Sequence, residues 1–197
     1  MTLFRITLHD KTDEQLMELF ATRDSERAFE ELYRRHASRF KGFFMRMLAA
    51  DGALADDFLQ ELFLRIYQAR ESYRQGSSFS TWAFTIAYNL CRNEYRRRDV
   101  AEGYACEQRE AATAEVGELP DFESRYDRAV FYGQLKRALA GLTDEQRAAY
   151  TLRYEEELSV QEIARILHCP EGTVKSRLFY ALKLLKQALA DYKPKTD

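Results

Sequence analysis

The sequence predicts an all-α protein in which two small helical domains, a helical bundle and a helix-turn-helix domain, are joined by a flexible acidic linker. Only 8 Gly and 3 Pro occur among the 197 residues, a composition that favours long helices over a turn-rich β fold. Hydrophobic residues recur at helical spacing through most of the chain. The spacing is lost in one acidic stretch, so the expected units are residues 1–98, a linker at 99–122 and residues 123–197.

The first unit is expected to contain four helices that form a compact bundle. Hydrophobic side chains at helical spacing place them at residues 12–20, 25–48, 53–70 and 79–98. Asp51-Gly52 interrupts the pattern between the second and third helices, and a polar turn at residues 74–78 precedes the fourth.

Charge is distributed unevenly along the chain, although the net charge is only −2. Residues 1–98 carry 16 basic and 14 acidic side chains, whereas residues 99–142 carry 5 and 9. Near the carboxyl end, residues 172–195 hold six basic side chains and one acidic one. Two locally basic regions therefore flank an acidic middle, and such local faces decide nucleic-acid binding more than net charge does.

The remaining composition indicates a cytoplasmic protein without a bound metal or cofactor. The three cysteines are Cys91, Cys106 and Cys169, and no CxxC occurs, so neither a disulfide framework nor a zinc site is expected. His168-Cys169 invites a metal interpretation, but the other two histidines lie far away in sequence. No apolar run approaches the ~20 residues of a membrane helix, and no signal-peptide pattern is present.

The last third of the chain has the pattern of a helix-turn-helix. A helix is expected from near Glu123 to Leu142, and capping-box pairs follow at Thr143/Gln146 and Ser159/Glu162. The helix after Ser159 would place Ile163, Ala164 and Leu167 inward. A short turn at residues 168–172 and a further helix from Thr173 complete the motif.

The helix from Thr173 is the candidate for reading duplex DNA. Its expected core side is Val174, Leu178, Ala181, Leu182 and Leu185. The opposite side presents hydroxyls, aromatic rings and cations: Thr173, Ser176, Phe179, Tyr180 and Lys183, with Lys175, Arg177 and Lys186 at the margins. These groups can bond base edges and phosphates. The alternative is an amphipathic helix with a solvated basic face.

The third helix carries a candidate protein-docking patch. Its apolar side is Ala55, Phe58, Leu59, Leu62 and Ile66, and its polar side is Asp57, Gln60, Glu61 and Gln68. Leu64 lies in the middle of the polar side. A leucine ringed by acids and amides can anchor a partner, although a single exposed leucine often has no role.

The fourth helix carries a candidate single-strand site. Its core stripe is Ala83, Ile86, Ala87 and Leu90, and a second narrow stripe holds Thr81, Thr85, Asn89, Arg92 and Arg96. Trp82 and Tyr88 flank this second stripe, and Ser78, Phe79 and Ser80 lie at its start. Cations, amides, hydroxyls and aromatics together are the components of a single-strand site. The alternative is a solvated stripe beside ordinary core aromatics.

In their order, these motifs resemble the extracytoplasmic-function (ECF) class of bacterial sigma factors, from about Thr12 to Leu189. One segment, Asp57-x-x-Gln60-Glu61-x-Phe63-Leu64, is similar to the polymerase-docking segment. The promoter-melting segment is matched by Phe79-Ser80-Thr81-Trp82, Ile86-Ala87-x-Asn89 and Arg96-Arg97-Arg98. The helix-turn-helix is matched by Leu142-x-x-x-Gln146, Leu158-Ser159-x-x-Glu162-Ile163-Ala164 and Gly172-Thr173-Val174-Lys175-Ser176-Arg177.

The resemblance implies a transcription-initiation factor with core RNA polymerase and promoter DNA as partners and no enzyme activity of its own. Polymerase would be bound by Asp57, Gln60, Glu61, Phe63 and Leu64. The melted minus-ten element, with a base flipped into a pocket near Ser77 to Ser80, would be held by Ser77, Ser78, Phe79, Ser80, Thr81, Trp82, Thr85, Asn89, Arg92 and Arg96. The duplex minus-thirty-five element would be read by Thr173, Lys175, Ser176, Arg177, Phe179, Tyr180 and Lys183.

The resemblance also implies that the acidic linker threads polymerase channels and that an anti-sigma protein regulates the chain. The length of the acidic run before Glu123 departs from the family pattern, so the path of the linker is open. Three other classes compete: a helix-turn-helix regulator that acts without polymerase docking, a helical adaptor or anti-sigma antagonist, and an enzyme. The stripe suited to a single strand disfavours the regulator, and the exposed aromatics at Phe179 and Tyr180 disfavour the adaptor. The lack of a catalytic cluster or phosphate loop disfavours the enzyme.

Overall fold

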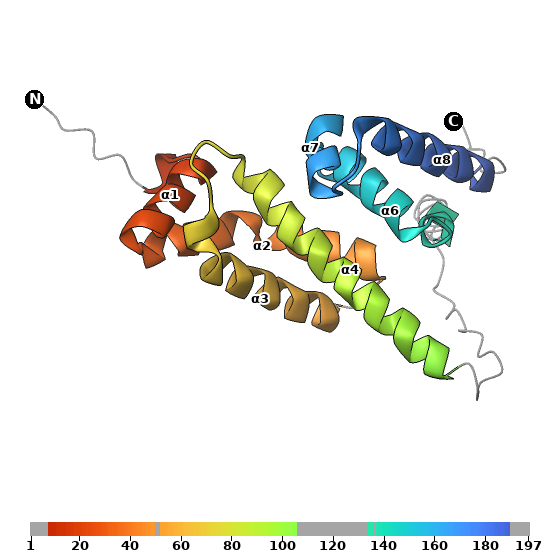
Figure 1. The fold of residues 1–197 in the computed structure, drawn as a ribbon, viewed down its shortest axis with the longest axis horizontal. Coiled ribbons are helices and arrows are strands. Elements are labelled where there is room, and N and C mark those ends of the chain that lie inside the picture. Colours follow the sequence, from red (N-terminus) through yellow and green to blue (C-terminus); the bar gives the residue numbers. More distant parts are fainter. Residues whose placement is uncertain (1–7, 50–51, 106–133, 136, 190–197) are drawn as a thin grey trace, which may run out of the picture.

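The computed structural model describes residues 8–49, 52–105, 134–135 and 137–189, and every regular element in these ranges is helical (Figure 1). The all-α prediction is therefore confirmed. Of the linker expected at 99–122, residues 99–105 belong to the fourth helix, whereas residues 106–122, with Cys106, lie outside the described residues, as does most of the helix expected from Glu123. Residues 134–135 and 137–140 of that helix are helical. No described helix is long and apolar enough to cross a membrane.

The first domain consists of four long helices with two short 3-10 turns between or before them. They are η1 (Leu8–Asp10), α1 (Asp13–Arg23), α2 (Glu26–Leu48), α3 (Gly52–Gln68), η2 (Arg70–Ser72) and α4 (Phe79–Ala105). A capping box between Thr12 and Gln15 begins α1, because each side chain bonds the backbone N–H of the other. Asp24 and Ala49, both in the left-handed conformation, end α1 and α2.

Aromatic side chains fill the core of the first domain. Six phenylalanines are wholly buried: Phe20, Phe40, Phe43, Phe44, Phe79 and Phe84. The rings of Phe40 on α2 and Phe84 on α4 lie 4.7 Å apart, centroid to centroid. Helix α2 is packed against α1, α3 and α4, so it forms the centre of the bundle.

Helix α4 is longer than expected, since it runs to Ala105 rather than Arg98. The side chain of Glu94 accepts hydrogen bonds from Arg97 at 2.8 Å and from Arg98 at 2.8 Å. These pairs at three and four residues' spacing stabilise the helix where the sequence pattern weakens. Arg98 also donates to the backbone oxygen of Leu48, which caps the end of α2.

The second domain has the expected helix-turn-helix. It consists of α6 (Asp144–Tyr150), a π-helical turn η3 (Thr151–Glu155), α7 (Val160–Ile166) and α8 (Glu171–Ala188). Both capping boxes are formed as predicted, one between Thr143 and Gln146 and one between Ser159 and Glu162. Four residues, 167–170, separate α7 from α8, and His168 among them is left-handed with φ of 50°.

The π-helical turn η3 was not expected from the sequence. The backbone N–H of Glu156 bonds the oxygen of Thr151 at 3.1 Å, and that of Leu158 bonds the oxygen of Leu152 at 3.0 Å. Glu157 takes a positive φ of 58°. This tight reversal turns the Glu156 side chain inward while the backbone leaves α6 for α7.

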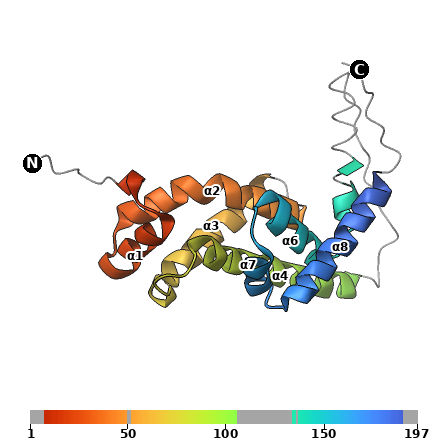
Figure 2. The same cartoon turned by 90° about the horizontal axis from the view of Figure 1, so that it is seen from above.

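The two domains pack against each other in this structure. The second domain lies along α2 and α4, with α7 on the side of α4 (Figure 2). Buried hydrophobic side chains of both domains, including Phe84, Leu158 and Ile163, belong to one continuous cluster. The division of the chain at residues 98 and 122 stays a prediction, because the second of these positions lies outside the described residues.

Candidate functional site

The docking stripe on α3 consists of Asp57, Gln60, Glu61 and Leu64. Leu64 is 51% exposed, as predicted, while Asp57 and Gln60 are exposed and Glu61 is half-buried. Phe63, which the sequence grouped with these residues, is only 4% exposed. Its ring lies edge-on to Tyr33 at 4.7 Å and near Phe29 and Phe40. Phe63 therefore supports the docking stripe from beneath rather than forming part of its surface.

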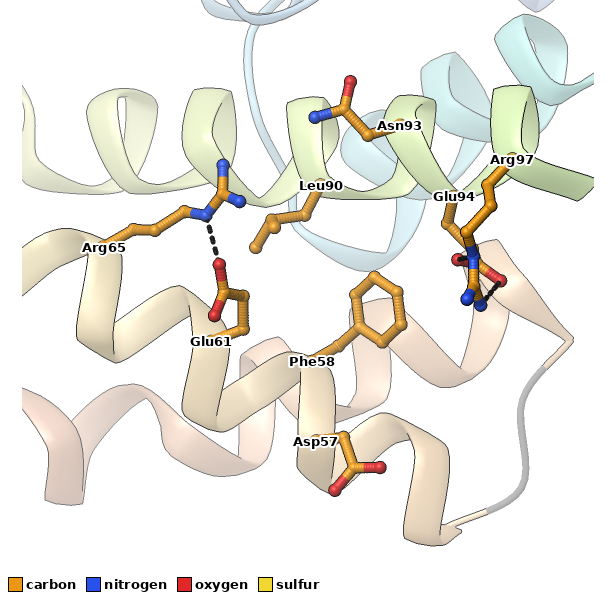
Figure 3. Close-up of a pocket in the computed structure, with 8 residues that line it drawn as sticks. All are labelled: Asp57, Phe58, Glu61, Arg65, Leu90, Asn93, Glu94 and Arg97. Atoms are coloured by element: carbon orange, nitrogen blue, oxygen red, sulfur yellow. Dashed lines mark hydrogen bonds and ion pairs between the residues drawn. The ribbon is translucent and has the colours of Figure 1, made fainter.

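A hollow of about 310 Å³ borders the docking stripe, between α3 and α4. Figure 3 shows Phe58 and Leu90 pointing toward each other across it. Its rim is charged and internally paired, because Glu61 bonds Arg65 at 2.6 Å and Glu94 bonds Arg97 at 2.8 Å. An apolar floor with a paired rim suits the side chain of a partner protein that brings polar groups around an apolar centre.

The turn before α4 is held by hydrogen bonds and by one special glycine. The hydroxyl of Tyr73 donates to the backbone oxygen of Ser77. Gly76 has φ of 82°, a conformation that L-residues with a side chain rarely adopt. The Ser78 hydroxyl accepts the backbone N–H of Thr81 at 3.2 Å, and Glu14 accepts that of Phe79 at 3.2 Å. Ser78 thus caps α4 and fixes the turn.

The aromatic residues at the start of α4 differ in exposure. Phe79 is wholly buried, with its ring centroid 5.1 Å from that of His36. Trp82 is half-buried and meets Tyr73 edge-on at 5.3 Å. Ser77, Ser78 and Ser80 are half-buried beside them. Trp82 is therefore accessible for stacking, whereas Phe79 belongs to the core.

The strand stripe on α4 consists of Thr81, Thr85, Asn89, Arg92 and Arg96. Arg96 is exposed, Thr85, Asn89 and Arg92 are half-buried, and Thr81 is only 9% exposed. Asn89 and Ile86 line a second hollow of about 370 Å³, with Arg65, Gln68 and Ala69 from the α3 side. The stripe therefore has an open margin, which faces α3, and a covered margin.

The second domain covers the other margin of the strand stripe. The Thr81 hydroxyl lies 3.4 Å from a carboxylate oxygen of Glu162 at the start of α7. Tyr88 is 4% exposed, and burial raises the pKa of its hydroxyl, as do Glu145 and Cys169, while Arg177 and Arg92 lower it. Glu145, Cys169 and Arg177 all belong to the second domain, so that domain closes over Tyr88.

Helix α8 presents the predicted DNA-reading side chains. Phe179 and Tyr180 are 63% and 52% exposed, and Lys175, Ser176 and Lys183 are exposed as well. Thr173 is half-buried, as is Arg177, whose guanidinium lies 3.4 Å from the sulfur of Cys169. In the part of the chain that the structure describes, no group of three potential metal ligands includes this cysteine.

One residue that was expected on the core side of α8 is exposed instead. Val174, Leu178, Ala181 and Leu185 are buried, but Leu182 is 42% exposed. Leu182 follows Ala181 by one step of about 100° around the helix, which moves it to the edge of the buried stripe. The prediction that put Leu182 in the core was wrong for this reason.

Three charged residues that the sequence did not single out meet between the domains. Glu156, on the second domain, is bonded by Arg39 and Arg46 of α2 at 2.6 Å each. Arg39 and Arg46 lie two helical turns apart and so share a face of α2, a signal that the sequence contains. Glu156 stands in an acidic run, Glu155 to Glu157, which has the ordinary composition of a solvated loop.

Comparison with known proteins places both domains in one family. Residues 32–100 match Sigma-70 region 2, and residues 132–185 match Sigma-70, region 4. The RNA polymerase sigma-H factor of Pseudomonas aeruginosa is 33% identical over 189 residues, which cover 92% of this chain and 96% of that protein. The ECF RNA polymerase sigma-E factor of Haemophilus influenzae is 32% identical over 190 residues, covering 90% and 95%.

The fold agrees with that of a solved sigma factor. The sigma factor RpoE of Bartonella quintana, determined in complex with the anti-sigma factor NepR, superposes with a TM-score of 0.64. The likeness covers 84% of this chain and 98% of that one at 22% identity. With both Sigma-70 regions present and relatives that span nearly the whole chain, this protein belongs to the ECF family of RNA polymerase sigma factors.

Proposed function

We propose that this sigma factor divides promoter recognition among three surfaces: the docking stripe for core RNA polymerase, the strand stripe for the melted minus-ten element, and α8 for the duplex minus-thirty-five element. Family membership makes the chain a factor that directs RNA polymerase to specific promoters. The observation that carries the proposal is that each surface has a different chemistry and stands on a different helix.

The docking stripe has the properties of a protein-binding surface. Leu64 offers an exposed apolar anchor, and Asp57, Gln60 and Glu61 surround it with acceptors. The adjoining hollow adds an apolar floor at Phe58 and Leu90. A few central apolar residues inside a polar rim supply most of the energy of such interfaces.

The strand stripe suits unpaired DNA. Asn89 can bond a base edge in the hollow that it lines, and Arg92 and Arg96 can bond phosphates. Ser77, Ser78, Ser80 and Trp82 stand at the turn where a flipped base is expected. Since Phe63 and Phe79 are buried, we propose that they support these surfaces and do not contact polymerase or DNA themselves.

Helix α8 suits the major groove of duplex DNA. Lys175, Ser176 and Lys183 are exposed for base edges and phosphates, and Phe179 and Tyr180 for sugars or thymine methyl groups. Thr173 lies in the first turn of α8, where backbone N–H groups attract a phosphate. Arg177 must exchange its contact with Cys169 for one with DNA.

We also propose that the chain has no catalytic activity, works in the cytoplasm and is regulated by an anti-sigma factor. Chemistry would belong to the polymerase, and the linker between the domains, expected at residues 99–122, would begin only after α4 ends at Ala105. The complex of the Bartonella relative with its anti-sigma factor supports this partner class. Two measurements test the regulation. A pull-down should show that a candidate anti-sigma protein binds the chain, and the same protein should reduce run-off transcription by the chain with core polymerase.

The division of labour can be tested by separating closed-complex formation from strand opening. Lys183→Ala or Arg177→Ala should weaken recognition of the upstream element by about 1–3 kcal/mol where a base contact is lost. Both should still support initiation on pre-melted templates. Asn89→Ala should instead impair strand opening with normal upstream binding. Ser78→Ala is a less specific probe, because it also removes the cap of α4.

The measurement is permanganate footprinting of the transcription bubble beside filter binding of the closed complex. Loss of the same step by the same factor in both mutant classes would contradict the proposal. Run-off transcription tests the remaining alternative, a regulator that acts without polymerase. The net charge of −2 predicts weak promoter binding by the free protein. Tight, specific binding unchanged by polymerase would favour that alternative.

A further inference from the structure

The contact between the domains is centred on one buried carboxylate. The side chain of Glu156 is 1% exposed, and its two oxygens are bonded by the guanidinium groups of Arg39 and Arg46 at 2.6 Å each. Arg39 also donates to the backbone oxygen of Glu156 at 2.8 Å. Both arginine side chains remain 34% exposed. The carboxylate thus depends on the other domain for its bonds, while each arginine keeps partial access to water.

The first domain is shaped to receive this carboxylate. The guanidinium of Arg39 lies 5.0 Å from the ring centroid of Phe84, which supports it on one face. Gly42 lies between the two arginines on α2, and a Cβ there would come within 3.1 Å of the Arg46 guanidinium. The glycine therefore leaves room for Arg46 to lie along the helix toward Glu156. A glycine inside a helix costs about 0.5–1 kcal/mol relative to alanine, so this position is not explained by helix stability.

Two further contacts join the domains on either side of the carboxylate. Arg147 at the end of α6 donates to the backbone oxygen of Met47 at 3.3 Å. At the other end, Glu162 of α7 meets Thr81 of α4. The helices α2 and α4 are therefore bridged at separate points by the second domain.

Closing the domains in this way hides part of the surface proposed to bind the melted strand. Thr81 and Tyr88 are 9% and 4% exposed, Glu162 of the second domain lies 3.4 Å from Thr81, and the negative charge of Glu145 acts on Tyr88. A DNA strand carries negative charge, so it cannot share this margin with two carboxylates. The docking stripe differs, since Leu64 remains exposed in the closed arrangement.

We propose that Arg39, Arg46 and Glu156 form an interdomain latch that holds the free protein closed, so that it engages polymerase before it can bind promoter DNA. The closed conformation is thus an autoinhibited state, an inference that rests on the proposed strand-binding role of α4. Buried ion pairs contribute little net stability, because desolvation of the charges offsets their attraction. They do favour one relative arrangement of the two domains, because separating the partners breaks the hydrogen bonds between the charged groups until water replaces those hydrogen bonds.

The test replaces the latch carboxylate with a neutral group of the same shape. Glu156→Gln in the full chain keeps the shape of the side chain, but its single amide oxygen can accept from only one arginine and its NH2 group faces the donors of the other. Loss of one hydrogen bond and of the charge assistance should raise the ratio of open to closed molecules roughly tenfold. Hydroxyl-radical footprinting with mass spectrometry reports this as greater oxidation of Tyr88, with Phe44 in the first-domain core as the internal reference for unfolding. Glu157→Gln is the matched control, because it removes the same charge from an exposed neighbour.

A second variant approaches the latch from the other domain. Arg39→Gln removes one guanidinium from α2 and should also increase Tyr88 oxidation. Lys41→Gln is its control, because Lys41 pairs with Asp56 of α3 within the first domain. If Glu156→Gln lowers helical content, Arg39→Gln carries the test. Unchanged Tyr88 oxidation in the folded variant overturns the latch.

Binding of a fluorescein-labelled single-stranded DNA of mixed sequence separates the latch from the proposed function. The anisotropy of this probe should show tighter binding, by up to about tenfold, for Glu156→Gln than for Glu157→Gln. Greater Tyr88 oxidation without tighter DNA binding would retain the latch as a clasp between domains and overturn both its inhibitory role and the strand-binding role of α4. Tighter DNA binding with unchanged Tyr88 oxidation would overturn the latch alone.

Discussion

Two adjacent residues of α3, Phe63 and Leu64, offer a test of the docking stripe that separates folding from binding. Leu64 is 51% exposed, whereas Phe63 is 4% exposed and packs against three aromatic rings. Full burial of a leucine is worth about 1.5–3 kcal/mol, so Leu64→Ala should lower the free energy of unfolding by about 1 kcal/mol at most. Phe63→Ala leaves a core cavity and should lower it by about 3–5 kcal/mol.

Binding to core polymerase should follow a different order from stability. Leu64→Ala removes the proposed anchor, so the free energy of binding should fall by at least about 1 kcal/mol, roughly fivefold in Kd. Phe63→Leu, which keeps most of the buried volume, should bind nearly as the wild type does once it is folded. Urea unfolding followed by circular dichroism gives the stabilities, and fluorescence anisotropy with labelled sigma factor gives the affinities. A folded Leu64→Ala variant with wild-type affinity would show that the docking stripe is wrongly assigned.

Three further predictions concern local structure. The hydrogen bond with His36 is the main cause that lowers the pKa of Asp13 below its usual value of about 3.8. The Asp13 carboxylate therefore contributes its full stability above about pH 3.8, and this contribution is lost as the pH falls through the lowered pKa of Asp13 in the folded protein. Asp13→Asn should accordingly flatten the acid side of a plot of Tm against pH. Ser159→Ala removes the cap of α7 and should cost about 0.5–2 kcal/mol in urea unfolding; no change would show that the cap is unimportant. At both Gly76 and Gly52, no described atom lies within 4 Å of an added Cβ. Gly76→Ala should lower the free energy of unfolding by about 1 kcal/mol or more, because Gly76 has a positive φ, whereas Gly52→Ala should not destabilise the protein. Equal Tm values for the two glycine variants would contradict this account.

The helices and their starts could be predicted because they depend on local chemistry. The capping boxes at Thr143 and Ser159 formed as predicted, since the side chain and the backbone N–H that it bonds are three residues apart. The exposure of Leu64, Phe179 and Tyr180 also agreed with helical periodicity. Periodicity was less informative at the margins of a face, where Leu182 is exposed although it was expected in the core.

The contact between the domains could not be predicted, because its determinants lie far apart in sequence. Glu156 is surrounded by other acids, and nothing in that run distinguishes it from a solvated side chain. Its burial depends on the π-helical turn at Thr151–Glu155, and the sequence pattern gave no sign of that turn. Arg39 and Arg46 share a face of α2, but that face gains a partner only when the second domain packs on it.

The covered margin of α4 has a composition that suits two different occupants. Threonine, tyrosine and arginine can bind an unpaired strand through hydroxyls, rings and positive charge, and the same groups can bind a protein surface that supplies carboxylates. In the closed structure Glu162 provides a carboxylate beside Thr81, and the negative charge of Glu145 acts on Tyr88. If α4 binds the melted strand as we propose, the strand and the second domain compete for one margin, and each weakens the binding of the other by the same free energy. We therefore expect that any interaction that separates the domains raises affinity for the melted promoter without a new contact to DNA.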